Sequence, residues 1–171
     1  MSKRSNNESR AENQQERLVQ IGWIVGFVDG EGCFSISVFR NRTTRFGWQI
    51  FPEFVVTQSE KSLSTLKQIK KYFSCGNIFI NRRYDNHKTP IYRYCIRNIA
   101  DLEKEILPFF EKYKLQSAKQ QDFEKFSVVV RMLRSKVHLS KEGFQEIVKI
   151  TGKSIELESS ETTRQAPPTR G

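Results

Sequence analysis

Apolar residues follow two different periods along the chain, and the changes between them divide the sequence into helices and strands. Helical spacing is found in four segments: 18–29, 62–73, 119–133 and 141–150. Alternation of apolar and polar residues is found in two pairs of segments, 33–40 with 48–58 and 77–83 with 91–97. Asp101 is expected to open a further helix as its N-cap, and Pro52 is expected at a sheet edge or a bulge. This order predicts an α+β fold, a four-stranded antiparallel sheet with helices on one face.

These segments form one predicted domain, because 171 residues have room for a single core. The domain is expected to span 18–152. The polar extension at 1–17 has no apolar block of the kind that marks a signal peptide. The tail at 153–171 is rich in Ser, Thr and Pro, and we expect it to be disordered.

The first predicted helix carries glycines on one side. Gly22, Gly26 and Gly30 recur every four residues and therefore share one face. A glycine inside a helix costs about 0.5–1 kcal/mol relative to alanine. Such a stripe indicates close approach of another helix, so we expect this helix to be buried on nearly all sides.

An acidic residue lies at the end of the same helix. Gly30 and Gly32 bracket Glu31, an arrangement typical of a helix that ends in left-handed geometry. A carboxylate there faces the negative end of the helix dipole, which is unfavourable by roughly 0.3–1 kcal/mol. A divalent cation would relieve this repulsion, and magnesium or calcium accepts carboxylate and carbonyl oxygens. The alternative is a glycine-rich turn after an ordinary core helix.

Alternation also predicts what covers each sheet face. In the second hairpin Ile78, Ile80, Tyr92, Tyr94 and Ile96 form an apolar face toward the helices. The opposite face and the hairpin tips carry polar, basic and a few aromatic side chains: Ser35, Ser37, Phe39, Arg40, Asn41, Arg42, Arg45, Asn77, Phe79, Asn81, Arg83, His87, Lys88, Arg93, Cys95 and Arg97. We expect no acid there, and we interpret this face as a DNA-binding saddle, because arginine can read guanine and asparagine adenine in the major groove. The alternative is a solvated face.

The composition supports a polyanionic partner. The chain has 29 Lys and Arg residues against 19 Asp and Glu, a formal charge of +10. No stretch approaches the roughly 18 apolar residues of a membrane-spanning helix, so no membrane partner is expected. Three cysteines, Cys33, Cys75 and Cys95, lack metal-type spacing and are interpreted as reduced thiols of an intracellular protein.

Residues 24–32 read IVGFVDGEG, which resembles the signature of the LAGLIDADG homing endonucleases. Further segments resemble that family in the expected order: 54–58 (FVVTQ), 72–78 (YFSCGNI), 114–123 (KLQSAKQQDF) and 138–143 (HLSKEG). The resemblance covers about residues 18–151. It implies an αββαββα-type fold and a site-specific homing endonuclease that breaks both strands of a long, pseudo-palindromic DNA target by metal-dependent hydrolysis.

The resemblance also implies roles for individual residues. Glu31 and a backbone oxygen near Gly30 would hold Mg²⁺, with Ca²⁺ or Mn²⁺ as substitutes. Gln58 matches the position that orients water, and Lys119 matches the basic position that stabilises developing phosphate charge. Lys61 fits a second basic position less well. The glutamate at position 31 departs from the commoner aspartate.

The sequence contains one glycine-and-acid helix, so its partner helix is expected from a second copy of the chain. The resulting homodimer would meet through Gly22, Val25, Gly26 and Asp29. Two alternatives keep the same scaffold: an RNA maturase that assists intron splicing, and a non-catalytic DNA-binding regulator. A structural RNA-binding protein is a third, suggested by charge alone. If the gene is intron-encoded, the resemblance implies a mitochondrion or chloroplast.

Overall fold

The computed structural model describes residues 2–81 and 89–153. Its helices are α1 Ser2–Glu31, α2 Leu63–Phe73, α3 Ile99–Asp101, α4 Leu107–Lys112, α5 Lys119–Arg134 and α6 Lys141–Ile150. Its strands are β1 Gly32–Arg40, β2 Trp48–Ser59, β3 Asn77–Asn81 and β4 Ile91–Ile96. They form one antiparallel sheet in the order β1-β2-β4-β3. The predicted α+β class and four-stranded sheet are confirmed.

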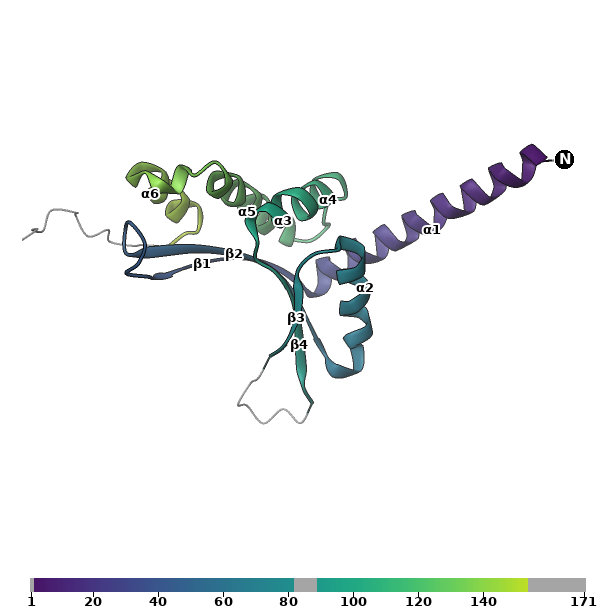
Figure 1. Cartoon of the computed structure of the whole chain (residues 1–171), viewed down its shortest axis with the longest axis horizontal. Coiled ribbons are helices and arrows are strands. Elements are labelled where there is room, and N and C mark those ends of the chain that lie inside the picture. Colours follow the sequence, from purple (N-terminus) through teal and green to yellow (C-terminus); the bar gives the residue numbers. More distant parts are fainter. Residues whose placement is uncertain (1, 82–88, 154–171) are drawn as a thin grey trace, which may run out of the picture.

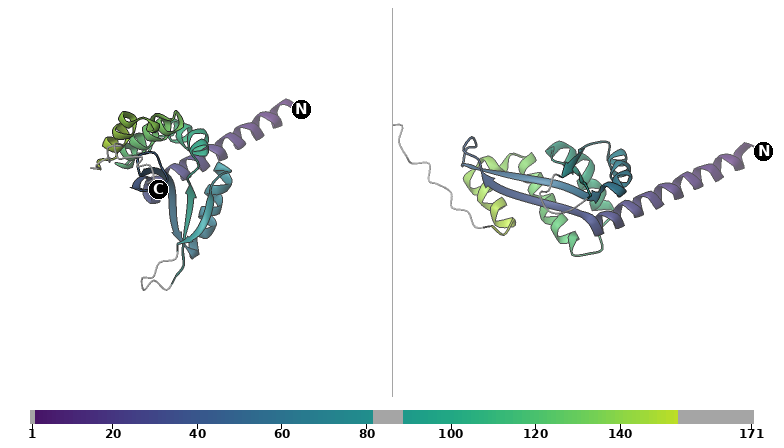
Figure 2. Two further views of the ribbon diagram at one scale, coloured as in Figure 1. Left: turned by 60° about the vertical axis from the view of Figure 1, so that its left-hand side comes forward. Right: turned by 90° about the horizontal axis from the view of Figure 1, so that it is seen from below.

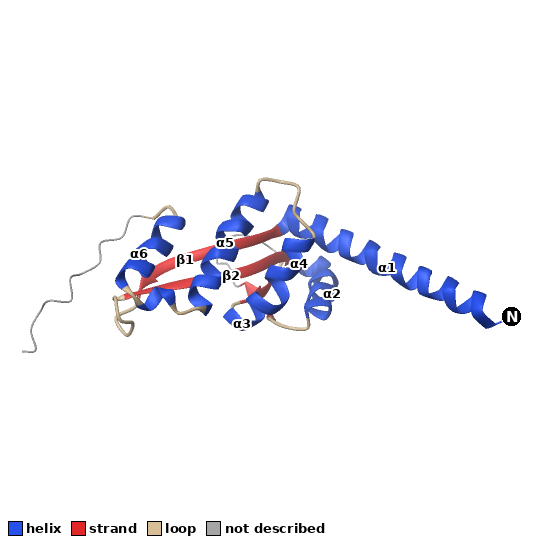
Figure 3. Ribbon diagram, turned by 90° about the horizontal axis from the view of Figure 1, so that it is seen from above, coloured by secondary structure: helices blue, strands red, loops and turns tan. Residues whose placement is uncertain are grey.

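The helices cover one face of the sheet and leave the other open. Seen from above, α5 and α6 cross over β1 and β2 (Figure 3), and seen from below the same strands lie uncovered (Figure 2). The helix pair α3 and α4 is joined by a π-helical turn, Leu102–Ile106. Short 3₁₀ turns, Glu60–Ser62 and Val137–Leu139, precede α2 and α6.

Aromatic rings fill the core between the sheet and the helices. Phe34 of β1 lies 5.2 Å from the ring of Phe54 on β2 and 5.2–5.5 Å from Phe110, Phe123 and Phe126 of the helices. Tyr94 is fully buried and donates its hydroxyl proton to the Cys75 carbonyl at 3.0 Å. Ile80, expected on this apolar face, is instead 53% exposed. It lies on the edge strand β3.

Helix α1 is longer and more open than the sequence suggested. It runs without a break for 30 residues, about 45 Å, and its N-terminal part projects away from the rest of the molecule (Figure 1). The expected boundary at residue 17 is therefore not a structural break. Only one side of the helix, with Ile21, Ile24 and Val28, is buried in the core. No described helix is long and apolar enough to cross a membrane, and the expected disordered tail lies outside the described residues apart from Lys153.

The end of α1 differs from the left-handed geometry that we expected. The described glycines with positive φ are Gly47, Gly76 and Gly152, so neither Gly30 nor Gly32 adopts that conformation. Instead α1 passes directly into β1 at Gly32. A Cβ at Gly32 would lie 2.6 Å from Val28 Cγ1 and 2.8 Å from the Val28 carbonyl oxygen. Glycine is required here because the strand starts in contact with the preceding helical turn.

Pro52 lies within a central strand, at a point where that strand has only one neighbour. It is opposite Ile36 on β1, whereas pairing with β4 begins at Phe54. The missing N–H therefore costs no hydrogen bond to β4, in agreement with the rule that proline occurs at locally free edges.

We expect Gly32→Ala to destabilise the protein by about 1–3 kcal/mol, because the new methyl group overlaps the Val28 backbone. The measurement is urea unfolding followed by circular dichroism. Ser64→Ala, at an exposed position of α2, is the control, since it adds no atom near the junction. Equal stability of the two variants would contradict this account of the helix–strand junction.

Candidate active site and nucleic-acid interface

The outer side of α1 is a strip of bare backbone flanked by exposed apolar side chains. A Cβ at Gly22, Gly26 or Gly30 would meet no atom within 4 Å. Beside them Leu18, Val19 and Trp23 are 56%, 68% and 37% exposed. The expected burial on all sides is therefore not met within one chain. We call this surface, formed by Leu18, Val19, Gly22, Trp23, Gly26 and Gly30, the glycine strip.

Glu31 lies at the C-terminal end of α1, one residue beyond the glycine strip, and its side chain is exposed. The described residues contain no cluster of three His, Cys, Asp or Glu side chains that could hold a metal. One chain therefore supplies a single free-standing carboxylate at this point. Oxygen donors of this kind fit magnesium or calcium, but one carboxylate is too few for a complete site.

Lys119 approaches the same helix end from a distant part of the sequence. Its Nζ donates to the backbone carbonyls of Val28 and Asp29 at 3.0 and 2.8 Å. These are carbonyls of the last turn, which have no partner within the helix. The ammonium group therefore lies at the negative end of the α1 dipole, beside the turn that carries Glu31.

Asp29 makes the reciprocal contact with the start of α5. Its carboxylate accepts bonds from the Ser117 hydroxyl at 2.5 Å and from the backbone N–H groups of Gln116 and Ser117 at 2.9 and 3.1 Å. These bonds, that of the Ser117 hydroxyl first, hold the pKa of Asp29 below its usual value. Both oxygens are thus engaged within the chain. Asp29, predicted at the dimer interface, fastens the α4–α5 connection to α1.

Gln58 lies beside this junction, and Lys61 lies farther on. Gly32, which follows Glu31, is opposite Val56 on β2, and Gln58 is two residues beyond, half-buried and opposite Tyr92. Lys61 is exposed in the turn after β2. The structure thus brings the ends of α1, β2 and α5 together, with Glu31, Gln58 and Lys119.

Comparison with known proteins identifies the family of the chain. Residues 24–130 match the family model of the LAGLIDADG endonucleases. The chain belongs to the LAGLIDADG endonuclease family. It is 35% identical over 140 residues to probable intron-encoded endonuclease 3 of Neurospora crassa, covering 81% of this chain and 25% of that protein. It is 31% identical over 91 residues to the DNA endonuclease I-CeuI of Chlamydomonas moewusii, covering 53% of this chain and 40% of that protein.

Solved structures of the family have the same fold. The homing endonuclease I-TnaI superimposes with a TM-score of 0.67 at 39% identity, covering 77% of this chain and 84% of that one. I-SmaMI, bound to uncleaved DNA in the presence of calcium ions, gives 0.70 at 28% identity and covers 77% of this chain but 43% of its own. The chain spans about a quarter of the length of the curated relatives it matches first.

The open sheet face of this LAGLIDADG chain carries most of the predicted DNA-facing residues. Ser35, Ser37 and Phe39 of β1 alternate on this side, and Asn77, Phe79 and Asn81 of β3 are in register with Cys95, Arg93 and Ile91 of β4. Cys95 shares the face but is only 3% exposed, and its burial raises the pKa of the thiol. Cys95 therefore leaves the set of DNA-facing residues.

The predicted DNA-facing residues at the hairpin tips differ in the contacts that they make within the chain. Arg40 lies over the Trp48 ring at 4.5 Å, and Asn41 donates to the side chain of Gln49 at 2.7 Å. Arg45 donates to the Leu139 carbonyl at 2.9 Å, and Arg42 is exposed. The second hairpin tip, with Arg83, His87 and Lys88, lies outside the described residues.

The expectation that the open face carries no acid is wrong. Glu53 of β2 lies there, 6% exposed, and forms ion pairs with both Arg93 and Arg97. The alternation of side chains along β2 could have located this acid, because Gln49, Phe51, Glu53 and Val55 share one side of the strand. That side becomes the open face once Phe54 is assigned to the core.

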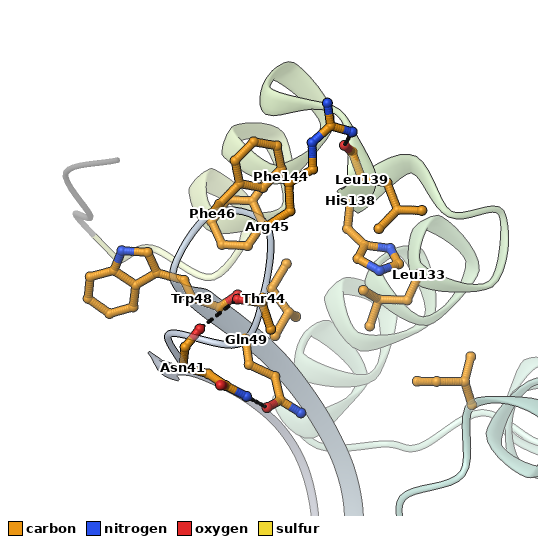
Figure 4. A pocket seen from close by; sticks show the side chains of 12 residues that line it. Asn41, Thr44, Arg45, Phe46, Trp48, Gln49, Leu133, His138, Leu139 and Phe144 are labelled. Atoms are coloured by element: carbon orange, nitrogen blue, oxygen red, sulfur yellow. Dashed lines mark hydrogen bonds between the residues drawn. The ribbon is translucent and has the colours of Figure 1, made fainter. Parts of the chain in front are cut away.

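A hollow of about 520 Å³ lies at the far end of the sheet from Glu31. Figure 4 shows the ring of Phe144 beside that of Phe46 of the first hairpin, with His138 and Leu133 across the hollow from them. Burial lowers the pKa of His138, and its Nδ1 has no hydrogen-bond partner among the described residues. These contacts hold the hairpin tip against the turn before α6.

The contacts of Asp29 predict a pH-dependent stability. Because its pKa is lowered in the folded state, its contribution is fully present above about pH 4 and is lost as the pH falls through the folded pKa. Asp29→Asn should cost about 1 kcal/mol at pH 6. The difference from wild type should shrink at pH 3, as measured by urea unfolding. Asp122→Asn, an equal charge change at an exposed site on α5, should show a smaller effect.

Proposed function

We propose that this protein is a site-specific DNA endonuclease that hydrolyses one phosphodiester bond on each strand of its target. The observation that carries the proposal is the position of Lys119. Its ammonium group is fixed on the last turn of α1, where Glu31 emerges at the end of an uncovered helix face. A cation and an acid held at one point on a basic protein suit phosphoryl chemistry better than simple binding.

Each residue of the site has its own role in the proposed reaction. Glu31, with a backbone oxygen near Gly30, would bind Mg²⁺, with Ca²⁺ or Mn²⁺ as substitutes; such an ion activates water and stabilises the attacking and leaving oxygens. Gln58 orients the attacking water, since a neutral amide can position water without removing its proton. Lys119 offsets negative charge that develops on the phosphate, and Lys61 can contact a neighbouring phosphate.

A dimer would supply the second carboxylate that a single chain lacks. Two copies of α1 pack through the glycine strip, which brings two Glu31 carboxylates together and joins the two open sheet faces. The match to 43% of I-SmaMI supports a half-sized unit that needs an equivalent partner. Two chains of +10 give a dimer of +20 that binds a long double-stranded, pseudo-palindromic site.

The exposed residues of the open face contact that DNA. Ser35, Ser37, Arg93 and Arg97 supply hydrogen-bonding groups for base edges and phosphates. The intron-encoded relatives support an organellar intron as the gene's location and the uninterrupted gene as the target.

The direct test is to incubate the purified protein with Mg²⁺ and DNA that contains the uninterrupted gene. Glu31→Gln should abolish cleavage while DNA affinity stays within about an order of magnitude, because the acid binds metal rather than DNA. Glu146→Gln, the same change at an exposed position of α6, is the control. Full cleavage by Glu31→Gln would remove Glu31 from the catalytic role.

Gly26→Leu tests the assembly. In one chain a side chain at position 26 enters open space, so the variant should fold normally. Between two packed helices the same leucine should cost about 1–3 kcal/mol, give monomers in sedimentation and stop double-strand cleavage. Gln145→Leu, at an exposed position of α6, should leave the dimer intact. A dimeric, active Gly26→Leu protein would refute the proposed interface.

A further inference from the structure

Glu53 holds two arginines in fixed positions on the open face of the sheet. Its Oε1 accepts a bond from Arg93 Nη2 at 2.7 Å, and its Oε2 accepts from Arg97 Nε. The carboxylate is buried, whereas the side chains of Arg93 and Arg97 are 32% and 45% exposed. The acid therefore lies beneath the surface, and the two guanidinium groups lie at it.

Aromatic rings restrict Arg97 further. Its guanidinium carbon lies 5.6 Å from the ring centre of Phe51 and 5.5 Å from that of Phe79. These contacts come from β2 and β3, on either side of β4. The side chain is thus fixed by an ion pair from below and by rings from two neighbouring strands.

The bonds to Glu53 also determine which N–H groups remain. Arg97 uses Nε, so its two terminal nitrogens can still donate side by side, in the spacing that matches O6 and N7 of guanine. Both oxygens of Glu53 are occupied, so the acid is poorly placed to accept a bond from cytosine. One carboxylate between two arginines also leaves a net charge of +1, which weakens attraction to phosphates relative to two free arginines.

We propose that Glu53 is a specificity-determining positioning residue, which holds Arg97, with Arg93 beside it, in the orientation that reads guanine in each half of the DNA site. The inference rests on the proposed DNA-binding function and goes beyond it by assigning the base preference and its cause. Stability alone is a weak reason for the cluster, because a buried ion pair is often no more stable than apolar residues of similar size.

The experiment selects preferred sites from randomised DNA with wild-type protein and then with Glu53→Gln. The amide of glutamine can accept from one arginine but presents its own N–H₂ to the other. We expect the guanine preference at one or two positions per half-site to fall by about tenfold. Binding to arbitrary DNA should become more salt-dependent, by up to about 0.9 in the slope of log K against log salt per chain, as a charge is freed for phosphate.

Two further variants separate positioning from folding. Glu111→Gln removes the same charge from an ion pair with Arg131 on the helical side, and it should leave the base preference and the salt slope unchanged. Arg97→Lys keeps the charge but loses the planar fork, and it should reproduce the loss of guanine preference without the steeper salt slope. Arg97→Lys also keeps the test decisive if Glu53→Gln fails to fold in thermal unfolding.

The outcomes are distinguishable from failure of the proposed function. A wild-type protein that enriches no sequence would overturn the proposed function itself. A wild-type protein with a defined site, whose guanine preference survives in folded Glu53→Gln, would overturn the role of Glu53, and a preference that survives in Arg97→Lys would overturn the assignment of Arg97 as the residue that reads guanine.

Discussion

The two contacts between the end of α1 and the start of α5 hold Lys119 beside the helix end that carries Glu31. Lys119 neutralises the carbonyl end of α1, and Asp29 neutralises the N–H groups that precede α5. Each helix end thus receives a side chain of opposite sign from the other element. The pair locks two elements nearly 90 residues apart in sequence. It also explains why Asp29 and Glu31, two acids in one motif, differ in their surroundings: the carboxylate of Asp29 is hydrogen-bonded within the chain, and that of Glu31 is exposed.

The same junction controls the sheet. Because α1 enters β1 without a loop, the register of β1 is fixed by the helix, and Gly32 is the residue that allows this close passage. The alternation that follows sends Phe34 into the core and Ser35 to the open face. A one-residue slip would exchange these two faces along the entire strand. The position of Glu31 and the identity of the sheet residues on the open face therefore both depend on the backbone turn that joins α1 to β1.

Periodicity was sufficient for the sheet, the helix order and the glycine strip, because each depends on neighbours within a few residues. It was not sufficient for contacts between distant segments. The bond from Lys119 to α1 followed from no local pattern, and its site came from the family resemblance. Glu53 was missed for a different reason. Residues 52–56 are all buried, so both sides of this part of β2 carry apolar residues, and the alternation assigns Glu53 to the open face only once Phe54 is assigned to the core. The role of Gly32 was misread because close approach and left-handed geometry both require glycine.

The exposed carboxylate of Glu31 lies at the end of the uncovered face of α1, so the proposed assembly and the proposed chemistry involve the same part of the chain. The glycine strip leads directly to Glu31, so a second copy of α1 that packs on the strip with two-fold symmetry would bring its own Glu31 close to that carboxylate. Two like charges at that point would oppose the association unless a cation lay between them. Metal binding should therefore favour helix pairing, because the cation offsets the repulsion between the two carboxylates. Helix pairing should in turn favour metal binding, because it brings a second carboxylate to the cation. In the proposed dimer the open face would follow the same two-fold relation, so that an arginine pair fixed in one copy would be repeated at a symmetric position in the second half-site.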